Sequence, residues 1–185
     1  MSVLGDLQPN KVFKYFEEIC SIPHGSRNLQ QISDYLVDFA KAHELKYRQD
    51  EDLNVIIWKD GSKGYEASEP VILQGHMDMV AVKEADCDKD MEKEGLDLEI
   101  NGDYISAKGT SLGGDDGIAV AYTLAVLDDE EMAHPPIEAI FTVNEEIGML
   151  GAATIDVSDL KGRLFMNMDS EDEGVFTVSC AGGAS

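Results

Sequence analysis

The sequence has few of the features needed to bind nucleic acid or to enter a membrane. Only 14 of its 185 residues are lysine or arginine, against 37 aspartate and glutamate, and the formal net charge is −23. Binding to nucleic-acid phosphates needs clustered basic side chains, so neither nucleic acid nor an anionic membrane is an expected partner. No run approaches the ~18 apolar residues of a membrane helix, and the first ten residues lack a secretory signal pattern. We therefore expect a cytoplasmic protein.

Cysteine and aromatic residues are also scarce. The three cysteines, Cys20, Cys87 and Cys180, are odd in number and share no CxxC spacing, so a disulfide framework or a structural zinc knuckle is not predicted. Aromatic residues make up 7% of the chain, yet 43% of all residues are hydrophobic, which is enough for one sizeable core.

The apolar pattern alternates between helical spacing and short runs typical of strands. Helices are predicted after Pro9, from about Asn28, and over residues 118–127. Strands are predicted at residues 53–58, 71–73, 137–143 and 163–168, with a hairpin around Asn101-Gly102 and another strand at 175–179. Interleaved strands and helices predict an α/β fold with a mixed, largely parallel sheet flanked by helices.

Four acidic segments each follow one of these apolar runs. They are Gly75-His76-Met77-Asp78, Gly113-Gly114-Asp115-Asp116-Gly117, Asn144-Glu145-Glu146 and Met168-Asp169. In open α/β sheets, ligands gather outside the carboxyl ends of the strands. Each segment alone has an ordinary explanation, such as a solvated histidine, an acidic helix N-cap or a polar turn. One histidine with several carboxylates is, however, a donor set that suits zinc, manganese or cobalt.

Spacing gives some of these side chains a role. His76 and Asp78 lie on the same side of an extended chain, so the carboxylate can accept the proton of one ring nitrogen and leave the other for a metal. A shared carboxylate can bridge two metals about 3.5–4 Å apart, and such a pair makes hydroxide available near neutral pH. Two choices stay open on spacing alone: the bridging residue within Asp115-Asp116, and base versus ligand within Glu145-Glu146.

The ordered segments resemble the zinc dipeptidase, aminoacylase and carboxypeptidase superfamily. The segments are GHMDMV (75–80), GTSLGGDDGIAVA (109–121), TVNEEIGMLGA (142–152) and MNMDSED (166–172). Two more, SIPHGSRN (21–28) and FTVSCAGG (176–183), are similar to segments of the aminoacyl-histidine (Xaa-His) dipeptidases. The resemblance implies a zinc-peptidase-like catalytic domain that hydrolyses Xaa-His dipeptides, with a related tripeptidase or deacylase as alternatives.

The resemblance also implies a role for each site residue. The implied metal ligands are His76, Asp115, Glu146 and Asp169. Asp115 would bridge two divalent ions, zinc first, with cobalt or manganese as alternatives. Glu145 would be the general base, and Asp78 would hold the ring of His76.

Part of the family pattern has no counterpart in this sequence. The family supplies a further histidine ligand from its C-terminal part, whereas His24, His43 and His134 all precede Asp169. It also has a smaller lid domain for substrate contacts and dimerisation. Residues 1–185 are therefore expected to be the N-terminal part of the catalytic domain of a longer, homodimeric peptidase that acts on small peptides. A truncated, catalytically impaired metal-binding fragment is the alternative.

Overall fold

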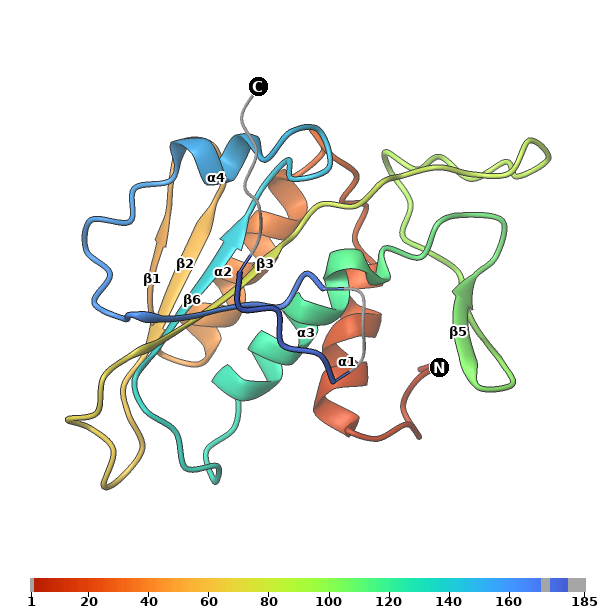
Figure 1. Ribbon diagram of the computed structural model, residues 1–185. Coiled ribbons are helices and arrows are strands. Elements are labelled where there is room, and N and C mark those ends of the chain that lie inside the picture. Colours follow the sequence, from red (N-terminus) through yellow and green to blue (C-terminus); the bar gives the residue numbers. More distant parts are fainter. Residues whose placement is uncertain (1, 171–173, 180–185) are drawn as a thin grey trace.

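The computed structural model describes residues 2–170 and 174–179, so the predicted motif positions 171–172 and 180–183 lie outside the described residues. The helices are α1 (Asn10–Cys20), α2 (Gln30–Ala42), α3 (Gly114–Leu127) and α4 (Leu150–Thr154). The strands are β1 (Lys46–Gln49), β2 (Val55–Lys59), β3 (Val71–His76), β4 (Leu98–Asn101), β5 (Tyr104–Ala107), β6 (Ile137–Thr142) and β7 (Leu164–Asn167). Figure 1 shows the sheet beside the three longer helices.

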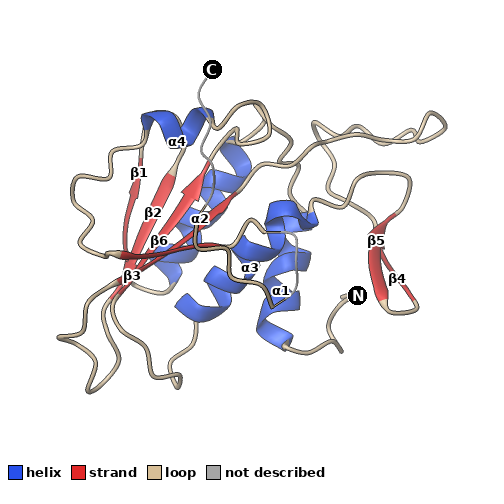
Figure 2. Cartoon of the chain, in the orientation of Figure 1, coloured by secondary structure: helices blue, strands red, loops and turns tan. Residues whose placement is uncertain are grey.

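The main sheet has the strand order β1-β2-β6-β3-β7. Strand β3 runs parallel to both β6 and β7, whereas β2 runs antiparallel to both β1 and β6. The predicted mixed sheet flanked by helices is therefore confirmed. Because β3, β6 and β7 are parallel, their carboxyl ends lie at the same edge of the sheet. Figure 2 shows β3 and β6 side by side in this sheet.

The three longer helices pack on one face of the sheet, because alternate strand residues point to that face. Val55 and Ile57 of β2 and Phe141 of β6 belong to the core formed with the helices. Ile56 of β2, Ile72 of β3 and Ile140 of β6 point to the opposite face. There they pack with Trp58, Ile155 and Leu160 in a smaller cluster. The apolar face predicted for the second helix, Ile32, Leu36, Phe39 and Ala40, is buried in the larger core.

Two strand predictions need correction. Strand β1 was missed because its sequence, KYRQ, is polar; its residues are exposed or half-buried at the sheet edge. The strand predicted at 175–179 is wrong, since these residues form no regular secondary structure. Their apolar side chains are exposed, with Phe176 at 79% and Val178 at 94%, and no neighbouring strand pairs with them among the described residues. An apolar run alone does not make a strand without a pairing partner.

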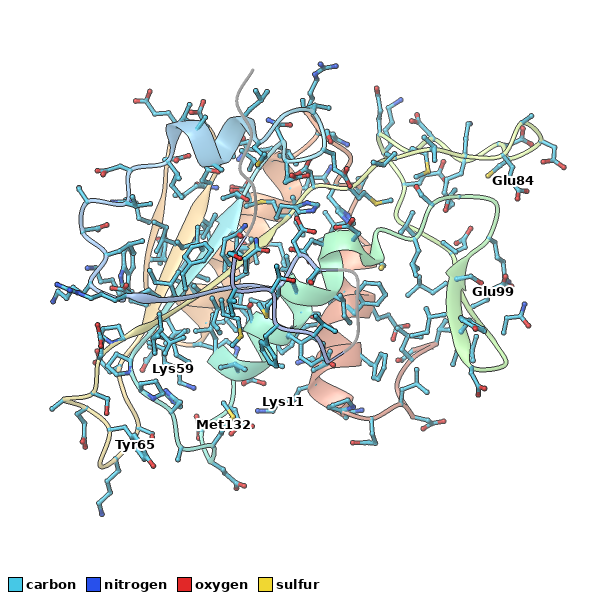
Figure 3. The ribbon with its side chains drawn as sticks, viewed as in Figure 1. Lys11, Lys59, Tyr65, Glu84, Glu99 and Met132 are labelled. Atoms are coloured by element: carbon cyan, nitrogen blue, oxygen red, sulfur yellow. The ribbon has the colours of Figure 1, made fainter. Side chains whose placement is uncertain are left out.

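The predicted hairpin lies on an arm that extends away from the sheet. The arm leaves the body after β3, carries β4 and β5, and returns at the start of α3 (Figure 1). Figure 3 shows Glu84 and Glu99 on this arm, at the opposite side of the molecule from Lys59. Within the described residues, no helix combines the length and apolar character that crossing a lipid bilayer requires. Cys20 and Cys87 are free thiols.

Candidate metal centre

The site begins with the last residue of β3. His76 pairs with Thr142 in the parallel ladder to β6, and its side chain is only 1% exposed. Its Nδ1 lies 2.9 Å from the backbone carbonyl oxygen of Asp78, which fixes the ring orientation. Its Nε2 lies 3.1 Å from Oδ1 of Asp115. A ring held at Nδ1 presents Nε2 to a ligand, which is the usual arrangement of a metal-binding histidine.

The aspartates at the start of α3 point in different directions. Asp115 has non-helical backbone angles, and its carboxylate is 71% exposed where it meets His76 Nε2. Asp116 is 2% exposed, and its Oδ2 accepts the backbone N–H of His76 at 3.1 Å. A Cβ at Gly75 would lie 2.8 Å from that Oδ2, so glycine is needed for Asp116 to reach the end of β3. Of the two, Asp115 faces the imidazole nitrogen that a metal would bind.

The other carboxylates come from the ends of β6 and β7. Two groups have potential ligand atoms that all lie within 4.8 Å of one another: His76 with Asp115 and Glu146, and His76 with Glu145 and Asp169. The structure thus gathers all four predicted ligands and the predicted base around one imidazole. The grouping of Glu146 with Asp115 matches the ligand pair that the family implies for the second ion, whereas Glu145, the implied base, lies with Asp169 and His76.

The ionisation of the site reflects this concentration of negative charge. Burial would lower the pKa of His76, but its contact with Asp78 and the charge of Asp116 raise it to about 9. Burial raises the pKa of Asp116 to about 7, with the charges of Asp169 and Asp115 adding to it against the pull of His76. Burial and the charge of Asp115 also raise the pKa of Glu146. A cation placed among these groups would relieve the repulsion.

Asp78 makes more contacts than the predicted one with the ring of His76. Its backbone carbonyl lies 2.9 Å from His76 Nδ1, and its carboxylate Oδ1 lies 3.5 Å from the same nitrogen. The buried carboxylate also accepts the backbone N–H of Glu145 at 3.0 Å and the hydroxyl of Ser26 at 2.7 Å. Burial raises the pKa of Asp78, but the contacts with His76, Ser26 and the Glu145 N–H outweigh it and lower the pKa.

The remaining histidines lie outside both groups of potential ligands. The Nδ1 atoms of His24 and His134 lie near backbone carbonyls, and His43 Nδ1 lies 3.4 Å from Asp128.

Two residues near the site, Ser26 and Asn54, were given no role from the sequence. Asn54 is buried, and its Oδ1 accepts the N–H of Val143 just before the two glutamates. For Ser26, the sequence signal was the SIPHGSRN segment, which indicated only a family resemblance.

Comparison with known proteins supports the dipeptidase resemblance. No protein-family model matches the chain. The cytosol non-specific dipeptidase of Escherichia coli strain K12 is 40% identical over 183 residues, which is 99% of this chain and 38% of that protein. The crystal structure of an aminoacylhistidine dipeptidase from Vibrio alginolyticus matches with a TM-score of 0.89 and 40% identity. The resemblance to the aminoacyl-histidine dipeptidases is confirmed.

The match to the aminoacyl-histidine dipeptidases covers only part of their length. It spans 92% of this chain but 35% of the Vibrio protein, so the chain corresponds to little more than a third of these relatives. A tripeptidase from Staphylococcus aureus matches with a TM-score of 0.73 at 22% identity, covering 90% of this chain and 44% of that one. That likeness shows a shared fold only.

Proposed function

We propose that this chain supplies the metal-binding and general-base residues of a peptidase that hydrolyses dipeptides of the Xaa-His type. The observation that carries the proposal is that His76 shares two groups of potential ligands, one with Asp115 and Glu146 and one with Glu145 and Asp169. Within each group the ligand atoms lie within 4.8 Å of one another. The 40% identity to a dipeptidase over nearly the whole chain supports the substrate class. The E. coli relative is named for the cytosol, which supports a cytoplasmic location.

The donor set fits a pair of divalent ions. An imidazole nitrogen and carboxylate oxygens are the ligands of catalytic zinc, and cobalt or manganese accept the same donors. In this proposal His76, Asp115 and Asp169 hold the first ion, and Asp115 and Glu146 hold the second. When bound, such ions would polarise the scissile carbonyl and acidify a water molecule.

The chain's own residues would carry the proton. Glu145 accepts a proton from the attacking water and returns it to the leaving amine, because a group that takes a proton early can donate it later. Its backbone is held by Asp78, which keeps the carboxyl beside the imidazole. Asp116 holds the backbone of His76 at the end of β3 and belongs to neither group of potential ligands.

Whole-protein features belong to the same proposal. Residues 1–185 would form the N-terminal part of the catalytic domain, and a lid domain elsewhere in the protein would mediate homodimerisation and contact the peptide substrate. The net charge of −23 makes nucleic acid an unsuitable partner.

Zinc titration tests the ligand assignment on this chain. Calorimetry is expected to show zinc binding by the unaltered chain and at least ~10-fold weaker binding by His76→Ala. Glu145→Gln should retain the affinity, because the proposal makes this residue a base. Glu131→Gln removes an exposed carboxylate outside the site and serves as the control. A Glu145→Gln variant that loses zinc as His76→Ala does would make Glu145 a ligand instead.

A second candidate is a metal-binding fragment without turnover. It is favoured by the donor count: if His76 binds the first ion, its group leaves the second ion two ligands among the described residues, Asp115 and Glu146. An assay of Xaa-His hydrolysis on the zinc-loaded chain separates the two candidates. Fewer than two tight zinc equivalents with no hydrolysis would favour the fragment, and hydrolysis that Glu145→Gln abolishes would favour the peptidase.

A further inference from the structure

The loop between α1 and α2 lies directly against the segment that follows β3. Residues 24–28 of this loop, called here the 24–28 loop, form a parallel bridge in which Gly25 pairs with Met79. The N–H of Met79 donates to the carbonyl of His24 at 3.2 Å, and the N–H of Ser26 donates to the carbonyl of Met79 at 3.2 Å. A Cβ at Gly25 would lie 2.6 Å from that of Ala81, so this close approach requires glycine.

The hydroxyl of Ser26 completes the surroundings of the Asp78 carboxylate. Ser26 Oγ donates to Oδ2 at 2.7 Å, while the backbone N–H of Glu145 donates to Oδ1 at 3.0 Å. Asp78 is 1% exposed, so water has little access to replace either donor. Hydrogen bonds to a buried carboxylate are strong, and they fix the plane of the group.

A second contact joins the same loop to the glutamate segment. The backbone N–H of Arg27 donates to Oδ1 of Asn144 at 2.8 Å. Asn144 has a φ of +53°, a left-handed conformation that asparagine adopts more readily than most residues. Ser26 and Arg27 therefore hold the two segments that carry His76 and Glu145, which lie far apart in the sequence.

We propose that Ser26 is a positioning residue for the metal centre: its hydroxyl orients the Asp78 carboxylate, which holds the Glu145 backbone beside the His76 ring. The inference rests on the proposed function, because the residues it positions are the proposed ligand and base. It gives the SIPHGSRN segment a physical role. The contact is one step removed from the proposed ligands, so Ser26 acts through Asp78 and touches neither metal nor substrate.

The test compares Ser26→Ala with two matched variants of the whole chain. Ser26→Thr keeps a hydroxyl. Ser21→Ala removes a hydroxyl that lies away from the site and donates to the Glu18 carbonyl, with a donor–acceptor distance of 2.6 Å. Two quantities are measured: zinc affinity by calorimetry, and hydrogen exchange of the Glu145 amide in the metal-free chain by NMR. Circular dichroism checks that each variant is folded.

Ser26→Ala is expected to weaken zinc binding by about 10-fold and to accelerate exchange of the Glu145 amide by about 10-fold. Amides in the core of β6 should keep their exchange rates, which a general loss of stability would not allow. Ser26→Thr should restore both quantities, and Ser21→Ala should change neither. Wild-type affinity together with unchanged Glu145 exchange in Ser26→Ala would overturn the inference.

The outcome for the proposed function is read separately, from the unaltered chain. If the unaltered chain binds no zinc, the proposed function fails, and the positioning role fails with it. If the unaltered chain binds zinc and only the Ser26 variants behave unlike the expectation, the proposed function stands and the role of Ser26 is refuted.

Discussion

Glu138 is a buried carboxylate whose removal should destabilise residues 161–162, the segment just before β7. It lies on β6, is 3% exposed, and faces the side of the sheet opposite the long helices. Its Oε1 accepts the backbone N–H of Lys161 at 2.9 Å, and its Oε2 accepts that of Gly162 at 2.9 Å. Strand β7 begins two residues later, and the predicted ligand Asp169 follows it.

The magnitude follows from these two contacts. A hydrogen bond to a charged group contributes ~1.5–3 kcal/mol, and Glu138→Ala removes two of them and leaves two N–H groups without their acceptor. We expect the free energy of unfolding to fall by about 3 kcal/mol. For a chain of this length, that corresponds to a midpoint of thermal unfolding lower by roughly 6–12 °C. Glu138→Gln keeps one acceptor, so its free energy of unfolding should lie between those of the unaltered chain and Glu138→Ala.

Thermal and urea unfolding, followed by circular dichroism, measure the effect. Glu69→Ala is the matched control, because Glu69 is an exposed carboxylate whose one ion pair within residues 2–170 and 174–179, with Arg163, spans 3.9 Å. Its removal should change the free energy of unfolding by less than about 0.5 kcal/mol. A Glu138→Ala variant as stable as this control would refute the view that the carboxylate anchors residues 161–162.

Two further predictions concern the rest of the fold. Gly151→Ala should lower the free energy of unfolding by about 1–3 kcal/mol, because its Cβ would lie 2.6 Å from the Val143 carbonyl oxygen and would overlap the Asn54 side chain; unaltered urea unfolding would contradict this. Glu17 is the other case: partial burial raises its pKa, but hydrogen bonds from Ser2, Val3 and Leu4 outweigh burial and lower the pKa. Its stabilising contribution is therefore present above roughly pH 4.3 and is lost as the pH falls through the lowered pKa. Glu17→Gln should have a lower free energy of unfolding than the unaltered chain at pH 7, and this difference should be smaller at pH 3. A difference in urea unfolding that does not change with pH would rule this out.

Local pattern was sufficient to predict most of the elements. The 3.6-residue spacing of apolar side chains gave α1 and α2, and compact β-branched or apolar runs gave β2, β3 and β6. The pattern failed where burial is not decided locally. Strand β1 is polar because it forms an edge, and residues 175–179 are apolar but have no strand to pair with among the described residues.

The sequence by itself determined which side chains follow the strand ends and which chemistry they offer: one histidine and a set of carboxylates suited to a divalent metal. Only the tertiary structure decided how far apart they lie. The alternation of side chains along a strand determines which face of the sheet each one points to, but it does not determine which strands pair. The pairing of β3 with β6 and β7 joins segments up to 93 residues apart at the Gln74–Asn167 contact. The same packing turns Asp115 toward His76 Nε2, buries Asp116, and brings Ser26 to Asp78.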